Sequence, residues 1–168
     1  MLDISKQTTI TEQDELFMRQ ALNLAKEAAL AGEVPVGCII VENNVVIAEG
    51  FNDRTQKHDP TGHAEIVALR QACAQKKYWR LPDATLYVTL EPCLMCAGAI
   101  MQAHLKRIVF GAFDAKNGAC GSHQQLEDVF ALNLNHHTSV TGGVLSSECG
   151  DLLRNFFLHR REQQKEKM

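Results

Sequence analysis

Two short motifs in this sequence bring metal-binding and proton-transferring side chains together. The tripeptide His-Ala-Glu over 63–65 stands where one helix is expected to begin, and Pro-Cys-Leu-Met-Cys over 92–96 stands where another begins, directly after a β-strand. One histidine and two cysteines form a competent ligand set for Zn²⁺. Because residues i and i+3 return to nearly the same side of a helix, the thiols of Cys93 and Cys96 can converge on one ion. The spacing therefore predicts a zinc site formed by His63, Cys93 and Cys96.

The predicted zinc site has the ligand number of a catalytic centre. Three protein ligands leave the fourth tetrahedral position to water, whereas structural zinc sites are closed by four. Glu65 follows His63 by two residues, and a carboxylate near such a water can take up its proton and return it elsewhere. Residues i and i+2 lie about 200° apart around a regular helix, so they flank one ion only from a helix end. We therefore expect the ion over the N-termini of both helices, with Glu65 as the catalytic base.

Two other interpretations of the motifs stay open at this point. A structural zinc site needs a fourth ligand, and its candidates are Cys38, Cys73, Cys120 and Cys149. None of these belongs to a second pair, so we expect each to be a small, buried apolar side chain. A catalytically silent subunit that uses zinc only for folding would keep the three ligands, but the presence of Glu65 argues against it. We expect the six cysteines to be thiols or ligands rather than disulfides.

Hydrophobic periodicity predicts the elements that position the two motifs. We expect helices over 11–32, 63–77, 93–103 and 147–165, and strands over 34–42, 45–52, 84–91, 107–112 and 139–142. Asn43 and Asn44 tolerate positive φ, which predicts a two-residue hairpin turn between the first two strands. The strand, helix and strand over 84–112 predict parallel pairing. Residues 113–137 are irregular apart from a helical turn over 124–130, and their length indicates a functional loop.

The composition is typical of one compact domain. The chain has 168 residues, of which 45% are hydrophobic and 22% charged, and this is enough to bury a core without cross-links. We expect a single domain over 1–168. No apolar run approaches the roughly 18 residues of a membrane helix, and the first fifteen residues lack the pattern of a secretory signal. We therefore expect no membrane contact and a cytoplasmic location.

The charge balance limits contact with nucleic acid to local patches. The formal net charge of −3 gives no general attraction for a polyanion. The basic residues of the C-terminal stretch are Arg154, Arg160, Arg161, Lys165 and Lys167. Acidic residues are interleaved with them, so we expect this stretch first as a solvated helix face.

Longer segments around the motifs resemble a known family. The segments PVGCIIV, GFN, HDPTGHAEI, ATLYVTLEPCLMCAGAI and RIVFGAFDAKNGACGS are similar to those of the bacterial tRNA-specific adenosine deaminases, a branch of the cytidine/deoxycytidylate deaminase superfamily. The resemblance implies a cytidine-deaminase-like α/β fold, a three-layer α/β/α sandwich with a mixed five-stranded sheet. It also implies one Zn²⁺ per subunit and a homodimer, for which Met95, Ile100 and Met101 are candidate interface residues that fit a core equally well.

The resemblance also implies a reaction and its substrate. The reaction is the hydrolytic deamination of adenosine to inosine at the wobble position of a tRNA anticodon, so that the partner is a tRNA anticodon loop. The zinc ligands are then His63, Cys93 and Cys96, and Glu65 is the proton shuttle. The alternative within the superfamily is a nucleobase deaminase that acts on a small substrate such as guanine or cytosine.

The resemblance further implies substrate contacts for four residues. It places Asn52 at the flipped adenine or its ribose and Asp114 at the anticodon backbone. It places Asn135 and His136 along the nucleotide path. The alternatives from the residues alone are a strand-end turn for Asn52, a loop cap for Asp114 and a turn for the Asn-His pair.

The chain departs from the family pattern at several positions. Cys38 and Gly62 stand where alanine is common, and Phe113 stands where arginine is expected. The last difference removes a candidate phosphate contact. Residues 122–134 match the family poorly, which leaves the breadth of substrates open.

Overall fold

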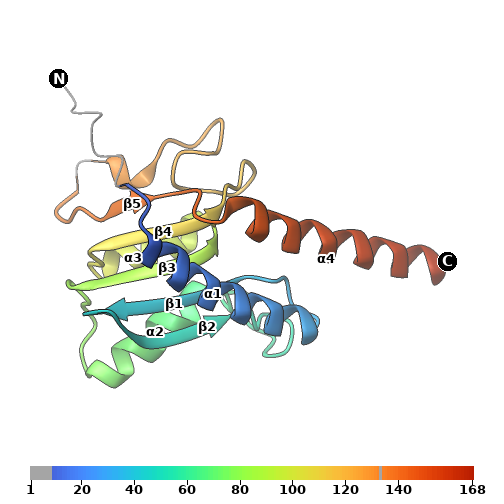
Figure 1. Cartoon of the computed structure of the whole chain (residues 1–168), viewed down its shortest axis with the longest axis horizontal. Helices are drawn as coiled ribbons and strands as arrows, with labels where there is room; N and C mark the ends of the chain where they lie inside the picture. Colours follow the sequence, from blue (N-terminus) through green and yellow to red (C-terminus); the bar gives the residue numbers. More distant parts are fainter. Residues whose placement is uncertain (1–8, 133) are drawn as a thin grey trace.

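A computed structural model describes residues 9–132 and 134–168 of the chain, and the structural statements below concern these residues. The elements are α1 Glu12–Leu30, β1 Gly37–Glu42, β2 Val45–Phe51, α2 Ala64–Lys76, β3 Ala84–Leu90, α3 Leu94–Gln102, β4 Arg107–Ala112, the 3-10 helix η1 Val129–Ala131, β5 Ser139–Thr141 and α4 Ser146–Glu166 (Figure 1). The predicted helices and strands are all present. The prediction of one domain over 1–168 includes residues 1–8, which lie outside the described residues.

The sheet is mixed and five-stranded, as expected. Its strand order is β2-β1-β3-β4-β5. Strand β1 pairs antiparallel with both β2 and β3, whereas β3–β4 and β4–β5 are parallel. Asn43 and Asn44 have φ values of 51° and 59°, which confirms the predicted hairpin turn. The helical turn expected over 124–130 is found later, at Val129–Ala131, where the Asp128 side chain caps it by accepting from the N–H of Phe130.

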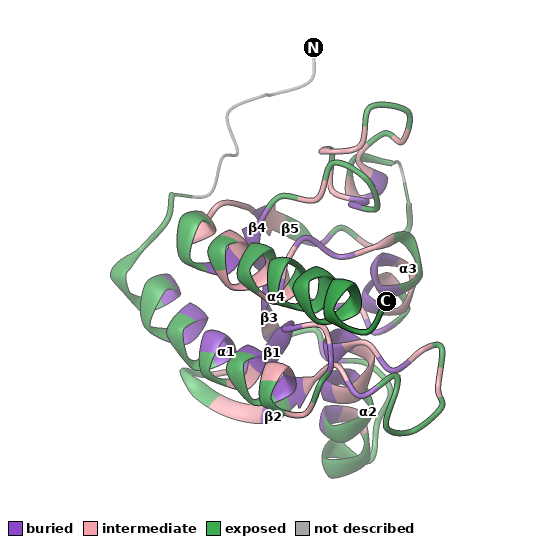
Figure 2. Ribbon diagram, turned by 90° about the vertical axis from the view of Figure 1, so that its right-hand side faces the viewer, coloured by how far each residue is buried: buried purple, intermediate pink, exposed green. Residues whose placement is uncertain are grey.

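Helices cover both faces of the sheet and complete a three-layer α/β/α sandwich. Figure 2 shows α1 and α4 on one side and α2 and α3 on the other. Alternate strand residues point to the two layers: Ile39 and Val109 pack in the core under α1 and α4, and Ile40 and Ile108 in the core under α2 and α3. Helix α4 continues past the sheet toward the C-terminus (Figure 1).

Close packing fixes the start of α2 against the sheet. A Cβ atom at Gly50 in β2 would lie 2.6 Å from the carbonyl oxygen of Ala64 and 2.8 Å from the backbone nitrogen of Ala68. Only glycine permits this approach. The first turn of α2, which carries Glu65, therefore lies directly on the sheet.

The burial of single apolar side chains separates the alternatives that the sequence left open, and it corrects the expectation for two cysteines. Ile100 is fully buried in the core and is unavailable to an interface, whereas Met95 is 38% exposed. Cys38 and Cys149 are buried as expected, but Cys73 and Cys120 are only half-buried. All six cysteines are free thiols.

Among the described residues, no helix is both long enough and apolar enough to span a membrane.

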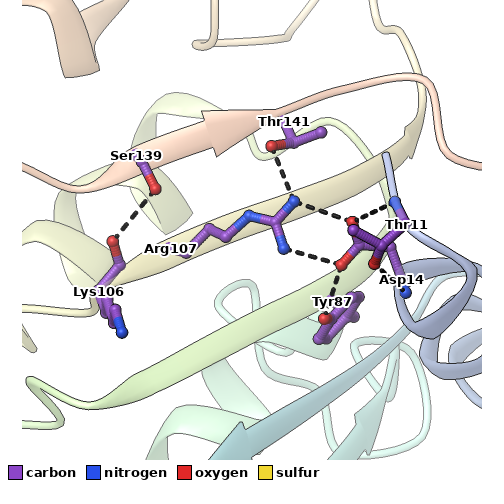
Figure 3. A network of polar contacts seen from close by, with 7 residues as sticks. All are labelled: Thr11, Asp14, Tyr87, Lys106, Arg107, Ser139 and Thr141. Carbon is purple, nitrogen blue, oxygen red and sulfur yellow. Dashed lines mark hydrogen bonds and ion pairs between the residues drawn. The ribbon is translucent and has the colours of Figure 1, made fainter. Parts of the chain in front are cut away.

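A buried ion pair ties α1 to the sheet at the start of β4 (Figure 3). The Asp14 carboxylate accepts two hydrogen bonds from the Arg107 guanidinium, at 2.7 and 3.0 Å, and one from the Tyr87 hydroxyl at 2.9 Å. It also accepts from the backbone N–H of Thr11 and completes the N-terminal capping box of α1. Burial alone would raise the pKa of Asp14, but these hydrogen bonds, led by that from Arg107, lower it below 3.8.

We expect Asp14→Asn to lower the free energy of unfolding by about 3 kcal/mol at pH 7, because it leaves a buried guanidinium without its counter-charge. The folded-state pKa of Asp14 is depressed, so its carboxylate contributes fully above about pH 4, the unfolded value. That contribution is lost as the pH falls through the folded-state pKa. Urea unfolding of both proteins should therefore show a difference that shrinks between pH 7 and pH 2.5. An equal difference at both pH values would contradict this assignment.

Candidate active site

Two of the three predicted ligands occupy helix N-caps. His63 is the N-cap of α2 and Cys93 the N-cap of α3, and both have extended backbone angles. An N-cap side chain usually bonds a free N–H of the first turn, yet neither of these side chains does so. Both face one point instead. The Nδ1 atom of His63 lies 3.6 Å from Sγ of Cys93 and 3.5 Å from Sγ of Cys96.

Asn52 caps α2 in place of His63. Its Oδ1 accepts a hydrogen bond from the backbone N–H of Ala64 at 2.9 Å. This bond frees the imidazole and fixes the orientation of the Asn52 amide. Because the carbonyl oxygen is occupied, the NH₂ group remains the free donor of Asn52 in the cavity that it lines.

The three ligand atoms fit Zn²⁺. Tetrahedral zinc with bonds of about 2.3 Å to sulfur and 2.0–2.1 Å to nitrogen places these atoms about 3.5 Å apart, close to the 3.5 and 3.6 Å found here. All three atoms lie within 4.8 Å of one another. Within 9–132 and 134–168, no other group of three His, Cys, Asp or Glu ligands is this close. A fourth side-chain ligand, which a structural site needs, is not found among these residues.

The electrostatics of the two thiols favour a cation between them. Hydrogen bonding from the Cys96 thiol lowers the pKa of Cys93 to about 4, against the opposing effect of burial and with further help from His63. The pKa of Cys96 is raised, because its proton is held by the Cys93 sulfur, because it is buried, and because the carboxylate of Glu65 is near. Both sulfurs become thiolates only when positive charge balances them, and Zn²⁺ supplies that charge.

Glu65 lies in the same cavity as the ligand atoms. It stands in the first turn of α2, is 4% exposed and lines the cavity with His63 and Cys93. Burial raises the pKa of Glu65, against smaller lowering effects from Cys96 and His63. A carboxyl group with a raised pKa can hold a proton near neutral pH and pass it on.

The cavity is small, and a larger groove lies next to it. Its volume is about 310 Å³, and Asn52, Arg54, Glu91, Asp114 and Asn117 line it beside the ligands and Glu65. The adjoining groove of about 850 Å³ runs along α4 and shares four residues with the cavity: Val34, Leu90, Asp114 and Asn117. The groove is also lined by Phe113, Lys116, Arg154, Phe157, Arg160 and Arg161. Three arginines that we expected on a solvated helix face therefore line a groove beside the candidate site.

The remaining predicted contacts lie in two different places. Asp114 lines both the cavity and the groove, and its Oδ1 also accepts hydrogen bonds from the backbone N–H groups of Lys116 and Asn117, each at 3.0 Å. Asn135 is exposed, and neither it nor His136 lines the cavity or the groove.

His136 is held near the amino end of β4, at the end of the sheet opposite to the cavity. Its Nε2 lies 2.9 Å from the carbonyl oxygen of Leu105, and its ring stacks on His104 with centroids 4.6 Å apart. Both of these residues precede β4, whereas the cavity lies at the carboxyl end of the neighbouring strand β3.

Sequence reasoning missed Glu91, Arg54 and Asn117 as cavity residues. A signal was present for Glu91, a charged residue between a hydrophobic strand and the Pro-Cys motif. Arg54 and Asn117 lie in polar loops, where their sequence context does not distinguish them from other loop residues.

Comparisons with known proteins agree with this geometry. Residues 11–112 match the family model of the cytidine and deoxycytidylate deaminase zinc-binding region. A tRNA-specific adenosine deaminase of Haemophilus influenzae is 49% identical over 92% of this chain and 89% of its own.

Two solved structures share the fold. One, from a study of A-to-I editing by tRNA:A34 deaminases at the wobble position of transfer RNA, is 42% identical, with a TM-score of 0.77 over 82% of this chain and 99% of its own. A guanine deaminase from Bacillus subtilis is 36% identical, with a TM-score of 0.59 over 72% of this chain and 74% of its own. On this family match and sequence identity, the chain belongs to the zinc-binding cytidine and deoxycytidylate deaminase family, in the branch of the tRNA-specific adenosine deaminases.

Proposed function

We propose that this protein deaminates adenosine to inosine by hydrolysis at the wobble position of a tRNA anticodon. The observation that carries this proposal is that the cavity of Glu65 and the arginine-lined groove along α4 lie side by side and share lining residues. A free base or nucleoside needs only the cavity. A groove with three arginines fits a longer, anionic substrate such as RNA.

The groove combines the two contacts that single-stranded RNA uses. Arg154, Arg160 and Arg161 supply positive charge for phosphates, and Phe113 and Phe157, which are 60% and 43% exposed, supply aromatic faces for bases. Because the net charge of the chain is −3, recognition rests on this local patch. An anticodon loop presents an unpaired base, which enters the cavity at a lower cost than a base taken from a duplex.

The residues of the cavity divide the reaction between them. His63, Cys93 and Cys96 would hold a Zn²⁺ ion, and this ion would supply Lewis acidity to a water at the site. Glu65 takes a proton from the attacking water and delivers it to N1 of adenine while the oxygen adds to C6. Glu65 then takes the proton of the new C6 hydroxyl and passes it to the amine as the C6–N6 bond breaks and the C6 carbonyl forms, so that water and adenosine yield inosine and ammonia.

Asn52 and Asp114 hold the substrate in this proposal. The free NH₂ group of Asn52 donates to the adenine or its ribose, and the Asp114 side chain contacts the anticodon backbone at the mouth of the cavity. We keep Asn135 and His136 as contacts to the RNA. Since both lie away from the cavity, they reach nucleotides outside it.

A nucleobase deaminase is the second candidate function, because a guanine deaminase is 36% identical to this chain. Ammonia release from free guanine and cytosine, from adenosine and from an anticodon stem-loop separates the two functions. Of these substrates, we expect turnover of the stem-loop only, and its wobble adenosine should be read as guanosine on sequencing. Turnover of guanine without the stem-loop would reject the RNA assignment.

The arginines of the groove provide a second test. We expect the double variant Arg160→Ala, Arg161→Ala to weaken binding of the stem-loop about tenfold at low salt. Each lost phosphate contact lowers the slope of log Kd against log salt by about 0.7, so the slope should fall by about 1.4. The control is Lys165→Ala, Lys167→Ala, which removes two charges from the same end of the chain outside the groove lining. Equal slopes for both double variants would contradict phosphate binding in the groove.

We further propose a cytoplasmic homodimer in which residues 1–168 form one deaminase domain. The support for a dimer is the exposure of Leu94 and Met95, at 56% and 38%, at the start of α3. These two neighbouring side chains are apolar surface that a second copy of the chain would bury. Sedimentation equilibrium of the purified protein measures the subunit number directly.

A further inference from the structure

We propose that Glu91 is a positioning residue whose carboxylate holds the segment 114–122 at the mouth of the cavity. This inference rests on the proposed function, because its consequence is the placement of Asp114 and Asn117 for RNA. Glu91 follows the last residue of β3, and it is only 2% exposed. No residue role described above uses it.

Three backbone donors converge on this one carboxylate. Oε2 of Glu91 accepts from the N–H of Asp114 at 2.8 Å, and Oε1 accepts from the N–H groups of Cys120 and Ser122 at 3.0 and 3.3 Å. The carboxylate thus joins the two ends of the segment. Among the described residues, Glu91 has no ion-pair partner, so these charge-assisted hydrogen bonds are what compensates its buried charge.

The middle of the segment packs directly against the same carboxylate. A Cβ atom at Gly118 would lie 2.4 Å from Cδ of Glu91 and 2.5 Å from the carbonyl oxygen of Asp114. The N–H of Gly118 donates to that carbonyl oxygen at 2.9 Å, and Gly118 forms an isolated β-bridge with Cys93. The segment therefore wraps around Glu91 and lies against the backbone of the zinc ligand Cys93.

The position of Asp114 and Asn117 depends on this attachment. Both residues line the cavity and the groove, and neither belongs to a helix or a strand. A glutamine at position 91 keeps one acceptor oxygen, but its NH₂ group is a donor. In either orientation of the amide, this NH₂ group faces a backbone N–H of the segment and cannot bond it. The segment then loses one attachment point, and Asp114 and Asn117 lose their fixed position.

The test compares Glu91→Gln with Asp14→Asn. For Glu91→Gln we expect KM for the stem-loop to rise about tenfold, kcat to stay within threefold, and one zinc per chain to remain. The amide of Asp114 should exchange hydrogen at least tenfold faster. Asp14→Asn also alters a buried carboxylate, but in α1, where it binds Arg107 at the start of β4, and it should change neither KM nor exchange at Asp114.

A second variant acts on the same carboxylate without changing its charge. The methyl group of Gly118→Ala would meet both the Glu91 carboxylate and the carbonyl oxygen of Asp114, so it separates the segment from Glu91 and should raise KM and speed exchange in the same way. Faster exchange with unchanged KM in either variant would overturn the proposal, and so would a higher KM with unchanged exchange or a loss of zinc. Failure of the proposed function appears instead in the wild type, as absent turnover of the stem-loop. In that case the role of Glu91 is decided by comparing the variants with the wild type in two measurements. These are KM for the base that the wild type does deaminate and hydrogen exchange at Asp114.

Discussion

Glu65→Ala is expected to lower kcat on an anticodon stem-loop by about 10³-fold while the protein keeps one zinc. Glu65 is the carboxyl group that faces the cavity from the first turn of α2, it is 4% exposed, and burial raises its pKa. General acid–base catalysis contributes about 10²- to 10⁴-fold to an enzymatic rate, and here one group handles both the water and the leaving amine. The three zinc ligands do not include Glu65, so the metal content should remain unchanged. Single-turnover kinetics and metal analysis measure the two effects separately.

Glu65→Gln serves as the matched variant for this prediction. It preserves the volume of the side chain in the cavity but cannot carry a proton. If both variants are inactive, a collapsed cavity is not the cause. Retained deamination by Glu65→Gln would remove Glu65 from the reaction, and loss of zinc from both variants would show that it acts through the metal site.

The elements were predictable because most of them have a clear period and clear ends. The strand over 84–90 alternates between the two cores, and the hairpin turn follows from Asn43 and Asn44. The buried face of α2 was less clear, because close approach at Gly50 buries Ala64 and Ala68 rather than larger side chains. The segment after β4 was the least predictable, since its shape depends on long-range hydrogen bonds to Glu91, which leave no local pattern.

The site was predictable where spacing along the chain determines geometry. The separation of Cys93 and Cys96 places two sulfurs together on any helix start, and His63 meets them because α2 and α3 begin at the same end of the sheet. The groove was not predictable in this way. The position of Arg160 beside the cavity depends on how α4 packs across the sheet, which its charge pattern does not reveal.

Removal of zinc is expected to abolish turnover and leave the fold intact. Two of the ligands are the N-caps of α2 and α3, and the third lies in the first turn of α3. The two main cores are built from apolar side chains that do not need the metal, such as Ile40 in one and Ile39 in the other. This differs from zinc fingers, in which metal binding supplies the folding free energy. Far-ultraviolet circular dichroism of the chelated protein should therefore match that of the zinc form, and one equivalent of zinc should restore deamination.

The stability of the zinc form should nevertheless be higher, because a ligand that binds only the folded state stabilises it by RT ln(1 + [L]/Kd). Free zinc at 1,000 times its Kd adds about 4 kcal/mol, which for a chain of this length raises Tm by about 10 °C.

Two cysteine variants test this effect without a chelator. Cys96→Ser should reproduce the lower Tm, whereas Cys149→Ser should retain zinc, because it changes a buried thiol that is far from the ligands in sequence. A chelated protein that is unfolded at 25 °C would make the metal structural. Full activity in a zinc-free protein would instead exclude a catalytic role for the metal that the three ligands hold, because Zn²⁺ is the Lewis acid that this proposal assigns to the attacking water.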